Sequence, residues 1–222
     1  MRPSVLLLAC ALSASACAGA IHEHRLLHPD AGAELRGAHR VAVLVDVEAS
    51  TSFELGGILL TSPEEAQRIA ASLRTAIDEC LSRQGLEPVL LDGTAGSELD
   101  EAKLLYRVVS GELYTMQYGS IPSTIARPRF EYGVGDVASI LERVGADHLL
   151  LVRASSARAT TLFGLPEPNL EHSYLFAGLV GPGGRIVFFQ GTKREGEAVF
   201  AGPRGTQRIV SELLSNVAGG DR

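Results

Sequence analysis

The chain is poor in the residues that aromatic binding platforms need. Its 222 residues contain no tryptophan, and aromatic residues make up only 5 % of them. The sequence contains 20 Lys and Arg and 26 Asp and Glu, which gives a formal net charge of -6. The basic residues do not cluster into a stripe. Nucleic-acid binding depends on neutralising phosphates with Lys and Arg. The composition therefore argues against nucleic acid as a partner, and equally against stacking on sugars or bases.

Cysteine is also scarce, which limits the chemistry available. The three cysteines are Cys10, Cys17 and Cys80, and the first two lie in an N-terminal segment with the pattern of a signal. Cys80 is then left without a partner, so no intramolecular disulfide is expected. It falls on the apolar face of a helical pattern, which predicts a buried, inert thiol.

No motif of a known catalytic or cofactor site is present. The sequence lacks G-x-S-x-G, G-x-x-x-x-G-K-[ST], H-E-x-x-H and C-x-x-C. Residues 133–138 match G-x-G-x-x-A ahead of a helix, but residues 127–132 do not form the buried strand that a dinucleotide turn requires. Asp136 would also place a negative charge where phosphate must lie, so we expect a loop in which Asp136 caps the helix. We expect no cofactor, no resident metal and no catalytic residue.

The one leader-like segment is at the N-terminus. Arg2 precedes an apolar core, and Ala14-Ser15-Ala16-Cys17 resembles the bacterial lipobox, with Ala14 where Leu is usual. Residues 1–17 therefore predict a lipoprotein signal whose Cys17 becomes lipidated. The alternative is an ordinary signal cleaved after Ala16, which would release a soluble periplasmic protein. No later stretch is apolar for the roughly 20 residues of a membrane span, so the predicted attachment is a lipid anchor.

The central feature of the remaining chain is the run from Ala146 to Arg153. It contains four consecutive apolar residues and no Gly or Pro, which is typical of a strand buried on both faces of a helix-covered sheet. A similar run, Val41 to Val45, opens the domain. Helical patterns between and after these runs predict an α/β fold.

The first half of the domain has clear boundaries. Residues 18–38 read as a flexible tether, in which His22, His24 and His28 leave a metal site open as an alternative. A strand at 39–47 is followed by a loop at 48–61. A helix then begins after Ser62 as N-cap, with a capping box to Glu65, and ends at Gly85. Residues 87–91 predict a strand near an edge, because Pro88 cannot donate a hydrogen bond.

The segment 92–135 is a possible insertion. A helix is expected from Ser97 to about Val109, with inward-facing Leu99, Ala102, Leu105 and Val109. A loop at 110–135 and a second at 161–171 follow. Because aromatic residues are scarce, their clustering in these loops suggests a partner contact, although packing within the domain remains an alternative. The candidate contact residues are Tyr114, Tyr118, Phe130, Tyr132, Leu162, Phe163 and Leu165.

The second half predicts a short helix at 136–144, a central strand reaching as far as Thr160, and a hairpin at 172–190. The hairpin turn is Gly181-Pro182-Gly183-Gly184. A last helix is expected at 204–217 and a tail at 219–222. The whole predicts one α/β domain at 39–218, with a mixed sheet of about five strands and three or four helices. Its order is strand-helix-strand-helix-strand-strand-strand-helix.

Three polar positions are candidates for chemistry. Asp46 and Glu48 lie at the end of the first expected strand, where open α/β sheets often carry active residues, but no third ligand, His or nucleophile accompanies them. His148 begins the central strand and is interpreted as a satisfied structural histidine. Asp147 is expected to accept backbone hydrogen bonds there.

The order of elements behind a lipoprotein signal resembles the curli-secretion (CsgG-like) group and the related N-terminal domain of TolB. The likeness rests on the strand at 40–47, Ser62 to Glu65 before its helix, Gly145-Ala146-Asp147 before a Leu-rich strand, and the 180–187 hairpin. It implies a non-catalytic component of the bacterial cell envelope that acts through protein contacts. Together with the signal at residues 1–17, it predicts a chain that is anchored by lipid and faces the periplasm, with the outer membrane as its expected location. Its expected partner is another envelope protein, with a homo-oligomer left open. The alternatives are an envelope hydrolase near Asp46 and Glu48, and a small-ligand or metal carrier.

Overall fold

The computed structural model describes residues 22–28, 31–53, 59–92, 97–118, 131–160, 172–195, 199–215 and 217. Their core is a seven-stranded mixed sheet in the order β1-β7-β6-β5-β2-β3, with β4 also paired to β2. The strands are β1 (His22–Leu27), β2 (Arg40–Phe53), β3 (Leu59–Thr61), β4 (Glu87–Leu90), β5 (His148–Thr160), β6 (His172–Val180) and β7 (Ile186–Glu195). The predicted mixed α/β fold is confirmed.

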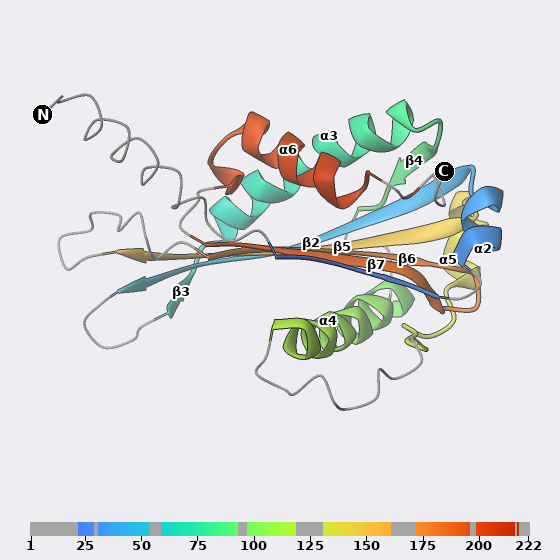
Figure 1. Cartoon of the computed structure of the whole chain (residues 1–222), viewed down its shortest axis with the longest axis horizontal. Helices are drawn as coiled ribbons and strands as arrows, with labels where there is room; N and C mark the ends of the chain where they lie inside the picture. Colours follow the sequence, from blue (N-terminus) through green and yellow to red (C-terminus); the bar gives the residue numbers. More distant parts are fainter. Residues whose placement is uncertain are drawn as a thin grey trace, which may run out of the picture.

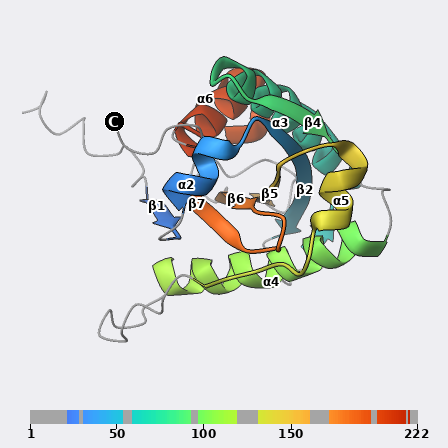
Figure 2. The ribbon, with the colours of Figure 1, turned by 90° about the vertical axis from the view of Figure 1, so that its right-hand side faces the viewer.

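Helices cover both faces of this sheet. They are α2 (Ala31–Gly37), α3 (Pro63–Arg83), α4 (Ser97–Tyr118), α5 (Ala138–Val144) and α6 (Pro203–Leu213), with a 3-10 turn η1 (Val199–Ala201). Helices α3 and α6 lie on one face and α4 on the other, while α2 and α5 lie at one end of the sheet (Figure 1). Figure 2, viewed from that end, shows α4 crossing beneath the strands.

Strand β5 is the centre of the sheet, as its apolar run predicts. It pairs in parallel with β2 over residues 41–53 and antiparallel with β6. Its side chains alternate between two cores: Leu150 and Val152 face α3 and α6, whereas Leu149 and Leu151 face α4. All four are buried. Because β5 is apolar at successive positions, its side chains pack against the helices on both faces of the sheet.

The structure begins earlier than the sequence suggests. Residues 18–38 are expected to form a flexible tether, yet His22–Leu27 pairs with β7 and Ala31–Gly37 is helical. Ala31 and Leu35 are buried in the core beneath α2. The tether prediction is therefore wrong for the described part of this segment, because a short amphipathic helix and an edge strand leave too weak a periodic signal to be read.

Two expected loops are shorter than predicted. Strand β2 continues to Phe53 and forms a hairpin with β3, so all of the described part of 48–61 is sheet. The polar run from Glu48 to Ser52 obscures this strand, which is held by its long parallel register with β5. Helix α4 likewise runs to Tyr118 instead of ending near Val109. The sheet accordingly has seven strands where about five are expected.

Other boundaries follow the sequence more closely. Strand β4 lies beside β2 at the edge, in accord with Pro88. Ser62 is the N-cap of α3 but makes no side-chain capping hydrogen bond, and Glu65 pairs with Arg68, so the predicted capping box is wrong. The chain leaves α3 through Gly85 in a left-handed conformation, as expected.

The β6–β7 turn at residues 181–184 packs closely against residues 133–136, which precede α5. Gly184 has a φ of +76°, and a Cβ there would lie 1.6 Å from the carbonyl oxygen of Gly135. The backbone nitrogen of Val134 donates to the carbonyl of Gly184 at 2.8 Å. Only glycine can occupy a position that is both left-handed and this close to another backbone.

Candidate functional site

The carboxylate of Asp46 is held beneath α4 by an arginine of that helix. Arg107 Nε lies 2.5 Å from Asp46 Oδ2, and Arg107 Nη2 lies 2.8 Å from Asp46 Oδ1, which makes a two-point contact. Lys103 Nζ is 3.7 Å from the same carboxylate. The hydrogen bond from Arg107 to Asp46 raises the pKa of Arg107. Asp46 is 9 % exposed, so its carboxylate is largely removed from water, whereas a third of the Arg107 side chain is exposed.

Glu48 extends the same network to the central strand. Its two carboxylate oxygens lie 3.2 Å from Arg107 Nη1 and 3.3 Å from Arg153 Nη2. Arg153 also donates to the backbone carbonyl of Arg107 and to the hydroxyl of Ser110. The four charged groups therefore join β2, β5 and α4. This arrangement attaches the helix to the sheet and gives both acids cationic partners.

An aromatic cluster continues this layer toward β6 and β7. Tyr114 lies edge-on to Tyr174 and Phe176, with ring centroids 5.1 Å and 5.8 Å apart. Burial, followed by a hydrogen bond with Tyr114, raises the pKa of Tyr174. Phe176 in turn stacks on Phe189. Tyr114, one of the expected contact residues, therefore packs against the sheet in this layer.

Close approach of α4 to the sheet depends on a glycine in β6. A Cβ on Gly178 would lie 2.7 Å from the ring of Tyr106. Tyr106 is buried, and desolvation raises the pKa of its phenol well above the usual value. Helix α4 is therefore held against the sheet by packing of the Tyr106 ring on Gly178 as well as by the ion pairs with Asp46 and Glu48.

The other expected contact residues are only partly described. Tyr132 is half-buried and lies beside Glu112, which together with burial raises the pKa of its phenol. The side chain of Tyr118, together with Phe130, Leu162, Phe163 and Leu165, lies outside the described residues. Their role in a contact surface stays a prediction.

The outer side of α4 carries an apolar surface that the sequence pattern had not indicated. Leu104, Leu105 and Val108 are 60 %, 37 % and 68 % exposed, and we call them the α4 patch. The inward residues are Leu99, Ala102, Tyr106, Val109 and Leu113. Leu105 is expected inward but lies at the boundary, because Tyr106 takes the core position. The 3-4-3-4 spacing of the inward set is the signal that places the patch outside.

A shallow depression of about 980 Å³ lies at the opposite end of the sheet from β3. Its described lining includes His148, Asp147, the Glu34–Arg185 ion pair and the turn glycines. His148 is buried, its pKa is lowered by desolvation, and its Nδ1 makes no hydrogen bond with any described residue. The structural position of His148 is as expected, but the expected hydrogen-bond partner is not found among the described residues.

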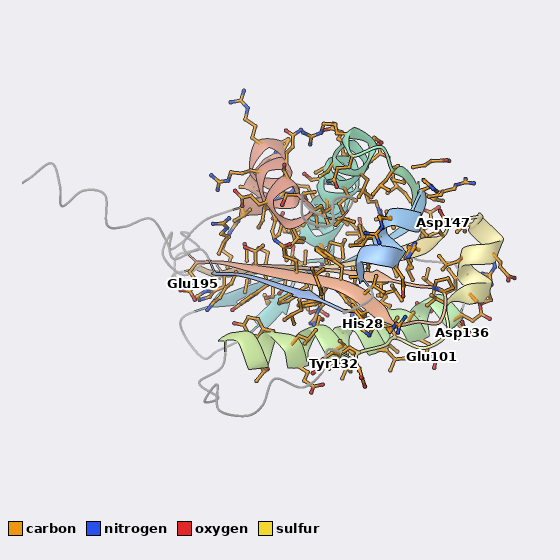
Figure 3. The ribbon with its side chains drawn as sticks, turned by 45° about the vertical axis from the view of Figure 1, so that its right-hand side comes forward. His28, Glu101, Tyr132, Asp136, Asp147 and Glu195 are labelled. Atoms are coloured by element: carbon orange, nitrogen blue, oxygen red, sulfur yellow. The ribbon has the colours of Figure 1, made fainter. Side chains whose placement is uncertain are left out.

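Asp147 behaves as the sequence predicts. Its Oδ2 accepts hydrogen bonds from the backbone nitrogens of His39 and Arg40, at 3.0 Å and 2.9 Å. These bonds hold the pKa of Asp147 below its usual value. Figure 3 shows Asp147 beside α2, far from Glu195 at the other end of the sheet. The carboxylate joins the starts of β2 and β5.

The remaining expectations concern Asp136, Cys80 and metals. Asp136 Oδ1 accepts from the backbone nitrogen of Ala138, although the N-cap position itself is Val137. Cys80 is buried, and Gln84 Nε2 donates to its sulfur. Among the described residues, no three His, Cys, Asp or Glu side chains gather as a metal site. No helix in the described part of the chain has the length and apolar character of a membrane span.

Comparison with known proteins adds little to this geometry. No protein-family model and no curated protein matches the chain. Among solved structures, the chain has a distant similarity to a PelC dodecamer from Paraburkholderia phytofirmans, at 11 % identity over 91 % of this chain and 100 % of that chain, with a TM-score of 0.43. It is more weakly similar to the Evf virulence factor, at 9 % identity over 79 % of this chain and 80 % of that chain, with a TM-score of 0.18.

Proposed function

We propose that this chain is a non-catalytic interaction component of the bacterial cell envelope, anchored by lipid at Cys17 and facing the periplasm. The observation that carries the proposal is the α4 patch, in which Leu104 and Val108 are largely exposed and Leu105 is partly exposed on one helix. An apolar group of this kind on a domain with two well-filled cores is typical of a surface that another protein covers. The anchor follows from the leader sequence.

The charged residues of the site fit this function. An enzyme built on Asp46 and Glu48 would need a carboxylate free to accept a proton or to attack. Both carboxylates are instead paired with Arg107, and Glu48 also with Arg153, in contacts that attach α4 to the sheet. A structural role for these acids favours an interaction protein over a hydrolase.

The resemblance to the curli-secretion and TolB group supports the same class of function. It is an analogy of fold and element order, so it supports the class of function and names no partner.

Fractionation and cross-linking in intact bacterial cells test the proposal. The full chain should sediment with membranes and should form recurrent cross-links to one envelope protein. Cys17→Ala should release it from the membrane fraction and weaken those links. Cys10→Ala is the matched control, because it removes the other leader cysteine and should change neither result. A wild-type chain that is not in the membrane fraction, or that gives no links, would refute the proposal.

A further inference from the structure

The α4 patch lies on a single stripe of the helix. Glu101, Leu104, Leu105, Val108 and Glu112 are all exposed and recur at three- and four-residue spacing. Residues so spaced share one face of a helix. At 1.5 Å per residue, the stripe from Glu101 to Glu112 is about 16 Å long. It therefore presents an apolar centre with an acid at each end.

A third acid stands beside the patch. A Cβ on Gly135 would lie 3.5 Å from Leu105 Cδ1, which places the segment before α5 alongside the helix. Asp136, the next residue, is exposed. Figure 3 labels Glu101 of α4 and Asp136 of the segment before α5 toward the same end of that helix, with Tyr132 further along it. The patch is thus bordered by carboxylates on three sides.

The cations of α4 do not balance these acids. Lys103 and Arg107 lie on the flank toward the sheet, where both contact Asp46 and where Arg107 also contacts Glu48. Both cations are therefore engaged by carboxylates of β2 beneath the helix and do not point toward the α4 patch. Among the described residues, the solvent-facing side of α4 is apolar at its centre and carries the three acids at its border. The exposed Arg143 of α5 is paired with a further acid of α4, Glu98.

We propose that the α4 patch docks an amphipathic segment of a partner protein in which Lys or Arg residues flank an apolar ridge. This inference rests on the proposed function and gives the chemistry of its partner. The apolar ridge covers Leu104, Leu105 and Val108, and the basic residues meet the three acids. Complementary charge steers such an encounter and fixes its register, while burial of the apolar centre supplies most of the affinity.

The acids at the border of the α4 patch favour a basic partner segment over a second copy of this chain and over an anionic lipid surface. If two copies paired through the same stripe in antiparallel fashion, Glu101 of one would face Glu112 of the other. A parallel pairing would set like acids opposite one another as well. An anionic lipid surface would meet the same repulsion. A basic partner segment removes the conflict.

Two synthetic helical peptides test the docking on the full chain. Both carry Leu at positions i, i+3, i+4 and i+7, and the remaining positions are Lys in one and Glu in the other. Fluorescence anisotropy should show binding of the basic peptide, weakened by added salt, and no binding of the acidic one. Equal binding of both peptides, or binding of neither, overturns the proposal.

A single substitution separates docking from mere attraction of opposite charges. Val108→Asp removes an apolar anchor and adds a negative charge, so simple attraction of the basic peptide would increase. Docking predicts instead a loss of about tenfold in affinity, the usual effect of losing one buried valine side chain. Thr75→Asp adds the same charge at an exposed position of α3, on the other face of the sheet, and should leave affinity unchanged. Unchanged or tighter binding by Val108→Asp overturns the proposal.

The two proposals can fail separately. Envelope cross-links that persist in Val108→Asp cells would leave the proposed function standing and remove the α4 patch as its surface. Peptide binding as described, with no effect of Cys17→Ala on localisation, would retain the docking chemistry and remove the anchor. Because Val108 is largely exposed, an unchanged circular dichroism spectrum of Val108→Asp verifies that the fold is intact.

Discussion

At the scale of single residues, Arg107 attaches α4 to the two carboxylates of β2. Arg107→Met would leave the largely buried carboxylate of Asp46 with only Lys103 at 3.7 Å. Breaking a fully buried pair costs about 3–5 kcal/mol, and a third of the Arg107 side chain is exposed, so we expect a loss of about 2 kcal/mol in the free energy of unfolding. Urea denaturation measures it. Arg143→Met, which breaks the exposed pair with Glu98, is the control and should cost less than about 1 kcal/mol. Equal losses would refute the structural role of the network.

The contribution of Asp147 to the stability of the fold should depend on pH. Its pKa in the folded chain is below the ordinary value of 3.8 because two backbone N–H groups bond its carboxylate. A lowered pKa means that the charged form stabilises the fold, fully so above about pH 5, and that this contribution is lost as the pH falls through the lowered value. Asp147→Asn should therefore lower the melting temperature at pH 7, and the gap to the wild type should narrow below about pH 4. A gap that stays constant from neutral to acidic pH would contradict this assignment.

At the scale of elements, β1 and α2 test where the domain begins. A chain starting at His39 would lack the helix that buries Ala31 and Leu35, and it would expose the edge of β7. We expect it to lose at least about 3 kcal/mol of stability and to aggregate, because an open edge strand recruits other chains. A chain starting at His22 should match the full chain in thermal unfolding and light scattering. Equal behaviour of the two truncations would return residues 22–37 to the role of a tether.

Some elements of this fold could be predicted from the local sequence pattern, and others could not. Strand β5 and the β6–β7 hairpin were predictable because an uninterrupted apolar run and a Gly-Pro-Gly-Gly turn leave few alternatives. Helix α3 was predictable from its long stripe of apolar residues. The later part of β2 was missed because its stability comes from pairing with β5, which is distant in sequence. The Asp46–Arg107 pair could not be predicted for the same reason, because no local sequence pattern indicates which cation will pair with a given carboxylate. Tertiary context decides such elements.

At the scale of the whole molecule, the two cores share one sheet, so they should unfold together. All five tyrosines belong to α4, the segment beside it or the face of β6 toward it, and the chain has no tryptophan. Tyrosine fluorescence therefore reports the α4 face, while far-ultraviolet circular dichroism reports every element. Leu150→Ala opens a cavity on the opposite face, beneath α3 and α6, and should cost about 2–5 kcal/mol.

If unfolding is cooperative, Leu150→Ala shifts the fluorescence and dichroism transitions in urea by the same amount. Leu149→Ala, the neighbouring residue on the α4 side, is the matched control and should move both transitions as well. A fluorescence transition that stays in place in Leu150→Ala would mean that α4 and its ion pairs form a separate unit. The docking surface would then belong to a layer able to detach from the sheet, and binding of the basic peptide would stabilise that layer alone. A common shift instead makes the α4 patch part of one cooperative unit, so the helix that carries the patch is folded before its partner binds and pays no folding cost at the moment of binding.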